Sequence, residues 1–343
     1  MHDSSPNFLS PRTIPQTAKD RLRVLFIAKN AGWTGDLHPQ DGNHAIYHRE
    51  TRETLEAIGL DLMVAQTPEI LFDPPGDIDF VFPLLNRAGY FNSEMLVPLL
   101  CERAGLAYLG ASPILRGLAD DKHLAKRAAA AAGAPTAPWA VFRKGAPLDL
   151  DALPPAERYV VKPNNSSASW GVRDASSREE VAAAVREIHE DSANGGQDAI
   201  VEPFLEGSDV EVPVVTIDGE PRILPLLIFR QSDPSHLRTY FEKRDLVERE
   251  TKYSLEAFTD PEISRQIAAL TAKVWGEYRP FDYGRFEFRV NEATGEMNFL
   301  ELNLNCNLWS QKVFGRAARM AGWSHEQLIE TILAEGLVRH GLL

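Results

Sequence analysis

The sequence predicts an α/β (α+β) protein of about two to three domains, and three observations support this prediction. The 343 residues are enough for several separate hydrophobic cores. From Arg23 to about Ser112, strand-like runs such as RVLFIA and IDFVFPLL alternate with helical candidates such as HAIYHRETRETLEAIG. An Ala-rich helix then ends at Gly133 and two nearby prolines, which indicates a boundary before the mixed strands and helices that follow.

The composition excludes several classes of protein. Hydrophobic residues make up 44% and charged residues 25%, as in ordinary globular chains, and no run of about 18 apolar residues predicts a membrane span. A net charge of -13 argues against nonspecific binding to nucleic acid. Cys101 and Cys306 lack metal-ligand spacing, so neither a disulfide framework nor a zinc site is predicted. We therefore expect a cytoplasmic protein without nucleic-acid or membrane partners.

The first predicted unit, residues 21–115, has the alternation of a Rossmann-like domain with a parallel sheet. Residues 1–20 precede it and are rich in Ser, Pro and Thr. They lack a signal-peptide pattern, and we expect a disordered tail. After the first strand the chain reads AKNAGWTGDLHPQDGN, without the GxGxxG pattern of dinucleotide-binding domains. The sequence therefore gives no support for a dinucleotide cofactor.

Two further units follow. Residues 116–206 contain the Ala-rich helix, the strand YVVKP, the polar loop NNSSASWG, a helix opened by the capping box Ser177-x-x-Glu180, and the strand DAIVEPF. Residues 207–343 contain the strands VEVPVVTI and ILPLLIF, a polar segment, a helix starting at Asp260-Pro261, two strand-like runs, and a terminal helix with the capping box Ser324-x-x-Gln327.

The two runs RFEFRV and FLELN form a predicted hairpin with acidic residues in apolar surroundings. A three-residue loop, 293–295, with Gly295 at the left-handed position, would pair Glu292 with Glu296. In this register the following pairs face each other: Val290 and Asn298, Glu287 and Glu301, Arg285 and Asn303. Because side chains alternate along a strand, the last two pairs share one face, and the other face is apolar: Phe286, Phe288, Leu300, Leu302 and Leu304.

The polar face of this hairpin predicts a metal site. Two facing carboxylates destabilise a hairpin unless a cation binds them or one of them is protonated. Mg²⁺ prefers carboxylate and amide oxygens and keeps water or phosphate in its remaining positions. The alternative interpretation is a solvent-exposed face that binds nothing.

Three residues elsewhere are candidates for contacts with a phosphorylated ligand. Lys162 ends an apolar run and precedes the loop NNSSAS, whose N–H groups and hydroxyls suit phosphate oxygens. Lys122 lies at the start of the Ala-rich helix. Glu202 follows three apolar residues and could accept a hydrogen bond from an amino group or a ribose hydroxyl. Each also has a plainer interpretation as a solvated surface charge or a strand-end acid.

Taken in order, several segments resemble the ATP-grasp superfamily, and most of all the D-alanine–D-alanine ligase family: DDKHLAKRAAAAAGAPTAPW, YVVKPNNSSASWGV, AIVEPFLEGSDVEVPVV, GRFEFRV and FLELNLNCN. The resemblance runs from about residue 105 to the C-terminus. It implies a three-domain ATP-grasp architecture, in which an N-terminal Rossmann-like domain precedes two α+β subdomains that sandwich ATP. It also implies an ATP-dependent ligase that joins a carboxylate to an amine through an acyl phosphate, with ATP and Mg²⁺ (two ions, or Mn²⁺ instead), and a homodimer.

The resemblance also implies roles for individual residues. Arg285 would lie beside the transferring phosphate, and Lys243 or Arg244 in TYFEKRDLVERETKY, which resembles a closing loop, would contact the γ-phosphate. The implied metal ligands are Glu287, Glu301 and Asn303. The implied ATP-binding residues are Lys122, Lys162, Ser167, Ser169, Glu202, Pro203, Phe204, Leu205 and, at the ribose, Asp209.

This set suits the chemistry of acyl-phosphate formation. Mg²⁺, lysine and arginine offset the charge that spreads over a transferring phosphoryl group. Arg285 can stabilise the oxyanion that forms when the amine attacks. A closed loop keeps water away from the acyl phosphate.

Four departures from the family pattern concern the amino-acid pockets. The family's GG-x-S-x-E-x-x-V-S, HG-x-x-GED and T-x-P-G-x-T-x-x-S segments are replaced by NAGWTGDLHPQDGNHAIYHRE, LLNRAGYFNSE and LNCNLWSQK, and Ala168 stands where the family has a hydroxyl. We therefore expect a specialised carboxylate–amine ligase with altered substrates. The candidates for substrate binding are Asp41, His44, Asn86 and Arg87 on the donor side, and Asn307 and Lys312, with Lys312 as the anchor of an acceptor carboxylate.

Other interpretations remain open at this point. The chain could be an authentic D-alanine–D-alanine ligase with divergent loops, or another ATP-grasp ligase that extends a glutamate or glutathione-like peptide. A non-catalytic ATP-binding regulator is an alternative of another class. Trp309 could shape the acceptor pocket or simply belong to the core.

Overall fold

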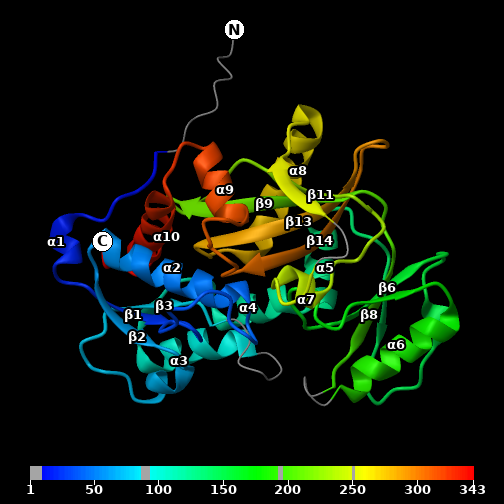
Figure 1. Ribbon diagram of the computed structural model, residues 1–343, viewed down its shortest axis with the longest axis horizontal. Helices are drawn as coiled ribbons and strands as arrows, with labels where there is room; N and C mark the ends of the chain where they lie inside the picture. Colours follow the sequence, from blue (N-terminus) through cyan, green and yellow to red (C-terminus); the bar gives the residue numbers. More distant parts are fainter. Residues whose placement is uncertain (1–9, 86–92, 192–195, 249–251) are drawn as a thin grey trace, which may run out of the picture.

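Three sheets organise the residues that the computed structural model describes, namely 10–85, 93–191, 196–248 and 252–343 (Figure 1). Their strands span residues 23–108, 140–203 and 208–304. Each sheet therefore lies within one of the three predicted units. Among the described residues, none of the helices combines the length and the apolar character needed to cross a membrane.

The first sheet is parallel, with the strand order β2-β1-β3-β4. Alternate residues of β1 enter two different cores, Val24 and Phe26 on one side and Leu25 and Ile27 on the other. Burial on both faces is what a parallel sheet requires, and it agrees with the predicted Rossmann-like domain. The elements are β1 (Arg23–Ile27), α2 (Asn43–Ile58), β2 (Asp61–Ala65), η1 (Pro68–Phe72), β3 (Phe80–Pro83), η2 (Ser93–Met95), α3 (Leu96–Ala104) and β4 (Ala107–Tyr108).

The predicted disordered tail is wrong for residues 10–20. They include the short helix α1 (Gln16–Lys19) and lie against α10 (His325–Arg339). The Arg12 N–H donates to Thr331 Oγ1 (2.8 Å), and the Ile14 N–H donates to Glu330 Oε1 (3.0 Å). Ile14 and Ala18 are buried in the same core as α10, so two apolar residues and two backbone hydrogen bonds fix a segment whose composition favours disorder.

The second sheet is antiparallel, with the order β5-β8-β6-β7, and α6 packs on it. The Ala-rich helix, α5, was predicted to belong to this unit, but α5 and the preceding helix α4 pack on the third sheet and share its core. Figure 1 shows α6 beyond β6 and β8, far from α8. The elements are α4 (Pro113–Asp120), α5 (Lys122–Ala131), β5 (Ala140–Phe142), η3 (Leu150–Ala152), β6 (Tyr159–Pro163), β7 (Arg173–Ala175), α6 (Arg178–Glu190) and β8 (Ala199–Pro203).

The third sheet has the order β12-β11-β9-β13-β14, with β10 paired to β9. The predicted helix start at Asp260 and the capping box of Ser324 and Gln327 are confirmed. Helices α9 and α10 share a hydrophobic core with β1 and α2, so the chain's last helices join the third unit to the first. The elements are β9 (Ser208–Ile217), β10 (Glu220–Ile223), β11 (Leu227–Gln231), α7 (Tyr240–Lys243), β12 (Tyr253–Ala257), α8 (Pro261–Tyr278), β13 (Tyr283–Asn291), β14 (Glu296–Leu304), α9 (Val313–Met320) and α10.

The register of the β13–β14 hairpin agrees with the prediction only at its far end, the end away from the turn. Glu287 faces Glu301 and Arg285 faces Asn303, as predicted. The predicted loop is wrong, because Asn291 pairs with Glu296 and residues 292–295 form the turn. Val290 accordingly faces Met297 and not Asn298, and Glu292 does not pair with Glu296.

A β-bulge explains why the far end still has the predicted register. The partner of Glu287 is Glu301, and the partner of Phe288 is Phe299, so Leu300 is the extra residue of β14. Phe299 is consequently buried in the core, and Leu300, predicted to be in the core, is only partly buried and lines a cavity. The bulge restores the pairing that brings the two glutamates together.

Candidate functional site

The polar face of three neighbouring strands forms what we call the carboxylate floor: Arg285, Glu287, Glu301 and Asn303 of the hairpin, and Glu211 of β9. Strand β13 lies between β9 and β14, so Glu287 has Glu211 on one side and Glu301 on the other. Backbone pairing of the strands thus fixes the relative positions of these side chains.

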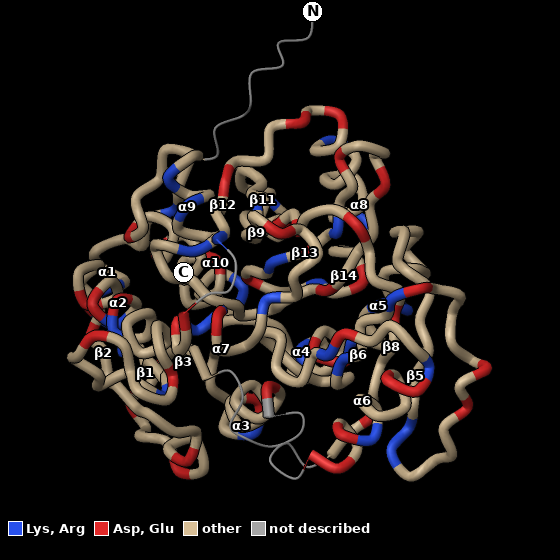
Figure 2. Tube along the Cα trace, turned by 45° about the vertical axis from the view of Figure 1, so that its right-hand side comes forward, with Lys and Arg blue, Asp and Glu red and all other residues tan. Residues whose placement is uncertain are grey.

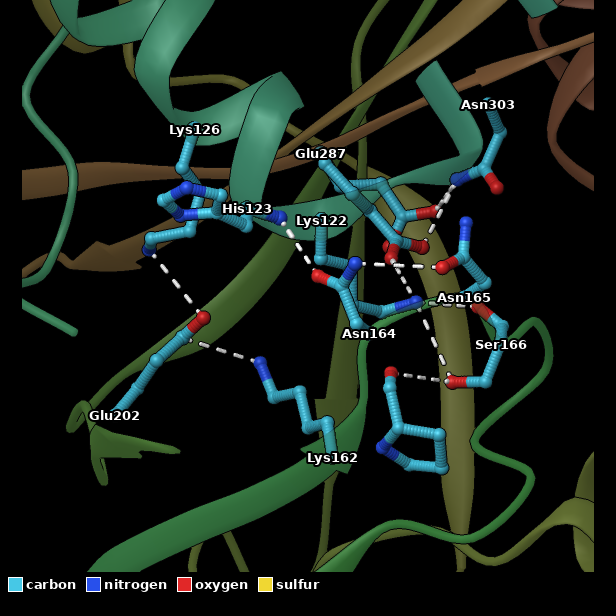
Figure 3. Close-up of polar contacts among 12 residues, drawn as sticks. Lys122, His123, Lys126, Lys162, Asn164, Asn165, Ser166, Glu202, Glu287 and Asn303 are labelled. Atoms are coloured by element: carbon cyan, nitrogen blue, oxygen red, sulfur yellow. Dashed lines mark hydrogen bonds and ion pairs between the residues drawn. The ribbon is translucent and has the colours of Figure 1, made fainter. Parts of the chain in front are cut away.

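Asn303 links the two facing carboxylates of the floor. Its Nδ2 donates to Glu287 Oε1 (2.8 Å), as Figure 3 shows, and also to Glu301 Oε1 (2.9 Å). Burial raises the pKa of Glu287, although Arg285 opposes the rise. Burial also acts to raise the pKa of Glu301, but Lys122, Asn303 and other lysines outweigh it and lower the pKa. The two carboxylates are therefore close, electrostatically coupled and directed to the same place.

Glu211 is a residue of this face that the sequence prediction missed. It is buried, and its Oε2 lies 2.7 Å from Arg285 Nε, while Arg285 Nη2 also contacts Glu287. Burial raises the pKa of Glu211, Arg285 opposes the rise, and Glu287 adds to it. The signal was present in the sequence, because an acid in the apolar run VEVPVV is as unexpected as the acids of the hairpin.

Opposite the floor, Glu202 of β8 holds two lysines (Figure 3). Glu202 Oε2 lies 3.1 Å from Lys162 Nζ, and Glu202 Oε1 lies 3.4 Å from Lys126 Nζ. Burial acts to raise the pKa of Glu202, but the two lysines outweigh it and lower the pKa to about 2. Glu202 is therefore a carboxylate that positions both cations.

Lys126 is the second residue that the prediction missed. It is fully buried, lies 5.2 Å from the centre of the Trp139 ring, and has a pKa that burial lowers. It follows Lys122 by one helical turn in α5. This i, i+4 spacing of two lysines, which places both on one face of the helix, is the signal that could have found it.

Lys122 and the loop after Lys162 lie next to each other. Lys122 Nζ contacts the backbone oxygen of Ser166 and lies 4.0 Å from Glu301 Oε2. The loop is anchored at Asn165, whose N–H donates to Gln197 Oε1 (2.6 Å). Figure 2 shows lysine, arginine and acidic positions gathered around β13, β14, α5 and β6. Cations of the second sheet and its neighbouring helix thus face acids of the third.

The predicted adenine and ribose residues follow β8 and begin β9. Phe204 packs under the Arg158 guanidinium (3.8 Å to the ring centre), and the Leu205 carbonyl accepts from Arg289 Nε (2.9 Å). Asp209 pairs with Arg289 Nη1 (2.9 Å) and lies 3.6 Å from Arg238 Nη2. The assignment of Asp209 to a ribose therefore stays a prediction. Its carboxylate already pairs with Arg289 of the neighbouring strand β13.

The prediction named either Lys243 or Arg244 as the phosphate contact. The structure gives these two side chains different surroundings. Burial and Arg238 lower the pKa of Lys243, and the acids that oppose this shift include Glu287 and Asp209. The Arg244 guanidinium instead lies over the Tyr240 ring (5.0 Å to its centre). Both side chains line the cavity, and the charges of the floor act on Lys243, so Lys243 is the better candidate for a phosphate contact.

The predicted closing loop spans residues 239–253, of which 249–251 lie outside the described residues. Its first part, residues 239–246, which we call the closing segment, rests on the first domain. The Asn43 N–H donates to the Arg244 carbonyl oxygen (3.2 Å), and Asn43 Nδ2 donates to Asp245 Oδ2 (2.6 Å) and to the Lys243 carbonyl oxygen (3.4 Å). The Trp170 ring meets the Tyr240 ring edge-on, with centres 4.8 Å apart. One short segment thus contacts both the first domain and the loop after Lys162.

A cavity of about 370 Å³ connects these groups. It is lined by most of the predicted site residues: His44, Lys122, Lys162, Ser167, Ser169, Glu202, Pro203, Phe204, Leu205, Asp209, Lys243, Arg244, Arg285, Glu287, Glu301, Asn303, Asn307 and Lys312. Asp41 does not line it and is instead held by Lys29 Nζ (2.8 Å) and Asn30 Nδ2 (3.1 Å). Asn86 and Arg87 lie outside the described residues. Trp309 is partly buried at the edge of the main core, 5.7 Å from Lys312 Nζ.

The floor fits a divalent cation. Within the described residues, no three His, Cys, Asp or Glu side chains already gather as a metal-ligand cluster. Two carboxylates joined by one amide group are nevertheless the kind of partial ligand set that Mg²⁺ uses when phosphate and water complete its coordination. Burial raises the pKa of Glu287, and the charge of Glu301 adds to the rise, so the ionised pair is costly and a bound cation would offset that cost.

Comparison with known proteins shows which family this chain resembles. A family model described as D-ala D-ala ligase C-terminus matches residues 129–334. The D-alanine–D-alanine ligase of Cupriavidus necator is 24% identical over 330 residues, covering 96% of this chain and 95% of that protein. An uncharacterized protein of Sinorhizobium fredii, y4sG, is 27% identical over 237 residues, covering 69% of this chain and 68% of that protein.

A solved structure has the same overall arrangement. The crystal structure of D-alanine–D-alanine ligase from Bacillus anthracis complexed with ATP aligns with a TM-score of 0.73 and 19% identity, over 93% of this chain and 99% of that one. At this identity the likeness concerns the fold. The predicted three-domain ATP-grasp architecture is thereby confirmed.

Proposed function

The chain belongs to the D-alanine–D-alanine ligase family of ATP-grasp carbon–nitrogen ligases, and from this premise we propose that it serves specialised metabolism. It is an ATP-dependent carboxylate–amine ligase that acts on small molecules. In the proposal, the donor is an amino acid or small carboxylic acid, and the acceptor is an amine, most simply another amino acid. ATP converts the donor to an acyl phosphate, the amine replaces the phosphate, and ADP and phosphate are released.

One observation carries the proposal. The carboxylate floor, Lys122 and Lys162 border the same cavity, with Lys122 Nζ 4.0 Å from Glu301 Oε2. Acids that suit a cation thus lie next to cations that suit phosphates. A regulator that only binds ATP has no need for a coupled pair of carboxylates, and this favours catalysis.

Each group has a proposed task in phosphoryl transfer. Glu287, Glu301 and Asn303 hold Mg²⁺, which when bound neutralises charge on the phosphate oxygens. Lys122 and Lys162 orient the ATP phosphates, and Lys243 contacts the γ-phosphate from the closing segment. The adenine lies beside residues 202–205. The proposal includes two metal ions. The same oxygen ligands also suit Mn²⁺.

Arg285 acts in the second step. Glu211 and Glu287 fix its guanidinium from two sides, so its direction does not depend on the substrate. A fixed cation costs no reorganisation when the tetrahedral oxyanion forms. The closing segment, latched by Asn43, keeps water from the acyl phosphate until the amine attacks.

The test is a screen of acids and amines for ADP release that depends on Mg²⁺, followed by mass spectrometry of the condensation product. We expect product and ADP in equal amounts for at least one pair. ADP release at background level for every pool of acids and amines would contradict a ligase and favour the ATP-binding regulator.

An authentic D-alanine–D-alanine ligase is the second candidate, because the Cupriavidus necator enzyme aligns over nearly the whole chain. The altered segments around the cavity, including Ala168 and the run LNCNLWSQK, argue for other substrates. Incubation with D-alanine, ATP and Mg²⁺ separates the two candidates, and we expect no D-alanyl-D-alanine. The homodimer stays a prediction, which sedimentation of the purified chain would test.

A further inference from the structure

A buried ion pair outside the proposed ligand sets borders the cavity. It joins Glu94 of η2, in the first domain, to Arg116 of α4, which packs on the third sheet. Arg116 Nη2 lies 2.7 Å from Glu94 Oε2, and the two side chains are only 6% and 7% exposed. Neither residue is among the proposed ligands of the metal, ATP or the substrates, so the pair has no task in the chemistry proposed so far.

A second nitrogen of Arg116 reaches the strand of the proposed metal ligands. Arg116 Nη1 donates to the carbonyl oxygen of Leu304, the last residue of β14. Leu304 directly follows Asn303, whose side chain links the two facing carboxylates of the floor. The planar fork of one arginine thus joins the first domain to the end of the strand that carries Glu301 and Asn303.

The next residue of the chain is anchored separately. Asn305 has a left-handed backbone (φ 50°), and its Nδ2 donates to the Leu109 carbonyl oxygen (3.1 Å). A Cβ at residue 110 would overlap the Asn305 amide group, so this close approach requires Gly110. The end of β14 is therefore held at two successive residues, and a substitution at Arg116 leaves the Asn305 anchor in place.

Stability alone does not account for the ion pair. Removing two charges from water is costly, and replacement of a buried ion pair by apolar side chains is often neutral or stabilising. Leu115, Leu118 and Ala119 of the same helix pack in or against the apolar core of the third sheet. Apolar packing is thus available along α4. What the pair adds is a guanidinium of fixed direction at the end of β14.

We propose that Arg116, oriented by Glu94, is a positioning residue for the metal site. Its hydrogen bond to the Leu304 carbonyl oxygen keeps the end of β14 where Glu301 and Asn303 can serve as metal ligands. This inference rests on the proposed ligase function and gives a task to two residues that are not themselves ligands. Outer partners of metal ligands act in this way, and their loss costs about 10- to 100-fold in metal affinity or activity.

Nucleotide binding tests the proposal without a need for turnover. Calorimetry measures the affinity for the ATP analogue AMP-PNP at a series of Mg²⁺ concentrations and in EDTA. The Mg²⁺ concentration that gives half of the full gain in affinity, the Mg²⁺ midpoint, reports on the metal site. The affinity in EDTA reports on the nucleotide pocket alone. A thermal melt of each variant gives its stability, which a merely structural role would change.

The variants are Arg116→Gln, Arg116→Lys and Glu94→Gln. Lys19→Gln is the matched control, because Lys19 forms a similarly buried ion pair with Glu330 (2.7 Å), and neither of these two residues lines the cavity. It removes a buried positive charge of an ion pair that does not contact β14.

We expect Arg116→Gln to raise the Mg²⁺ midpoint about tenfold and to leave the affinity in EDTA unchanged. Glu94→Gln should raise the midpoint by a smaller factor, since the amide oxygen still accepts a hydrogen bond from Arg116. Arg116→Lys keeps the charge but lacks the fork that reaches both partners, so it should not restore the wild-type midpoint. Lys19→Gln should lower the melting temperature and leave the midpoint unchanged.

A wild-type Mg²⁺ midpoint in Arg116→Gln would overturn the proposal even if the melting temperature fell, because the pair would then serve stability alone. A loss of AMP-PNP affinity in EDTA would place Arg116 with the nucleotide and not with the metal. If Arg116→Gln does not fold, Glu94→Gln decides, and an unchanged midpoint there overturns the proposal. Failure of the wild type to bind AMP-PNP at any Mg²⁺ concentration would count against the ligase function itself, so the two failures are distinguishable.

Discussion

The cavity is bordered by the carboxylate floor and by a second set of side chains, His44, Arg244 and Lys312, which we call the cationic corner. These two parts of the cavity are built in different ways. The floor comes from three hydrogen-bonded strands, and its side chains keep their spacing because the backbone pairs. The corner comes from the ends of three helices, and its side chains meet only when α2, α7 and α9 are packed together. The floor is therefore fixed within one sheet, whereas the corner depends on contacts between domains.

This difference suggests a division of labour. A sheet that fixes metal and phosphate ligands can serve any substrate, because the phosphoryl transfer is the same. A corner assembled from loops and helix ends can change its charges without disturbing that chemistry. Substitutions in the floor should reduce turnover with every substrate, and substitutions in the corner should change which substrate is used.

The largest expected effect is in the floor. Glu301→Ala removes one of the two facing carboxylates and should lower kcat by more than about a hundredfold, since loss of even an outer partner of a metal ligand costs 10- to 100-fold. The measurement is ADP release at saturating Mg²⁺, with circular dichroism to confirm the fold. Glu296→Ala, at the exposed start of the same strand, is the control. Activity of Glu301→Ala near the wild-type level would refute the metal assignment.

The next effect concerns the lysines opposite the floor. Glu202→Gln removes the charge that positions Lys162 and Lys126, and it should raise the KM for ATP strongly and destabilise the fold. A pKa lowered from 4.5 to about 2 corresponds to about 3 kcal/mol of unfolding free energy. Because the folded pKa is depressed, this contribution is present above pH 4.5 and is lost as the pH falls towards 2.

Urea denaturation of wild type and Glu202→Gln at several pH values measures this contribution. The difference in unfolding free energy should be constant at neutral pH and should shrink below pH 4.5. A difference that grows as the pH falls would contradict the assigned ion pairs. Glu206→Gln, close by in the chain, is the control for loss of one negative charge.

The sequence predicted the floor better than it predicted the corner, and the reason is physical. Strand period and an acid in an apolar run are local signals, and they located Arg285, Glu287, Glu301 and Asn303 together. The turn was wrong by one residue, but the bulge at Leu300 compensated for it. The same rule applied to VEVPVV would have found Glu211.

The corner and the tail depend on contacts that no local pattern contains. Asp41 was a candidate because it follows a parallel strand, yet its carboxylate is bound by Lys29 and Asn30. Ile14 docks on α10 from a segment whose composition suggests disorder. The helix α5 was assigned to the second unit by its place in the sequence, whereas its buried alanines pack on the third sheet. Tertiary packing decided each of these cases.

A substitution at Glu211 tests whether this residue of β9 contributes to catalysis together with the hairpin residues of the floor. Glu211→Gln removes the ion pair at Arg285 Nε but leaves the contact of Arg285 with Glu287. We expect kcat to fall about tenfold, with little change in the KM for ATP, because one charge-assisted contact is worth about that factor. Glu220→Gln on β10 is the control. A change confined to the KM for ATP would place Glu211 with the nucleotide and not with Arg285.

The smallest effect should come from the junction between the corner and the first domain. Asn43→Ala removes two hydrogen bonds to the closing segment, at Asp245 Oδ2 and the Lys243 carbonyl oxygen, and touches no proposed ligand. The segment should open more often and admit water to the acyl phosphate, so the ratio of ADP to ligated product should rise a few-fold while ATP binding stays the same. Asn298→Ala on β14 is the control, and the ratio is measured by coupled ADP assay and mass spectrometry. An unchanged ratio would mean that Asn43 does not control closure, and that the corner is held by packing of α2, α7 and α9 alone.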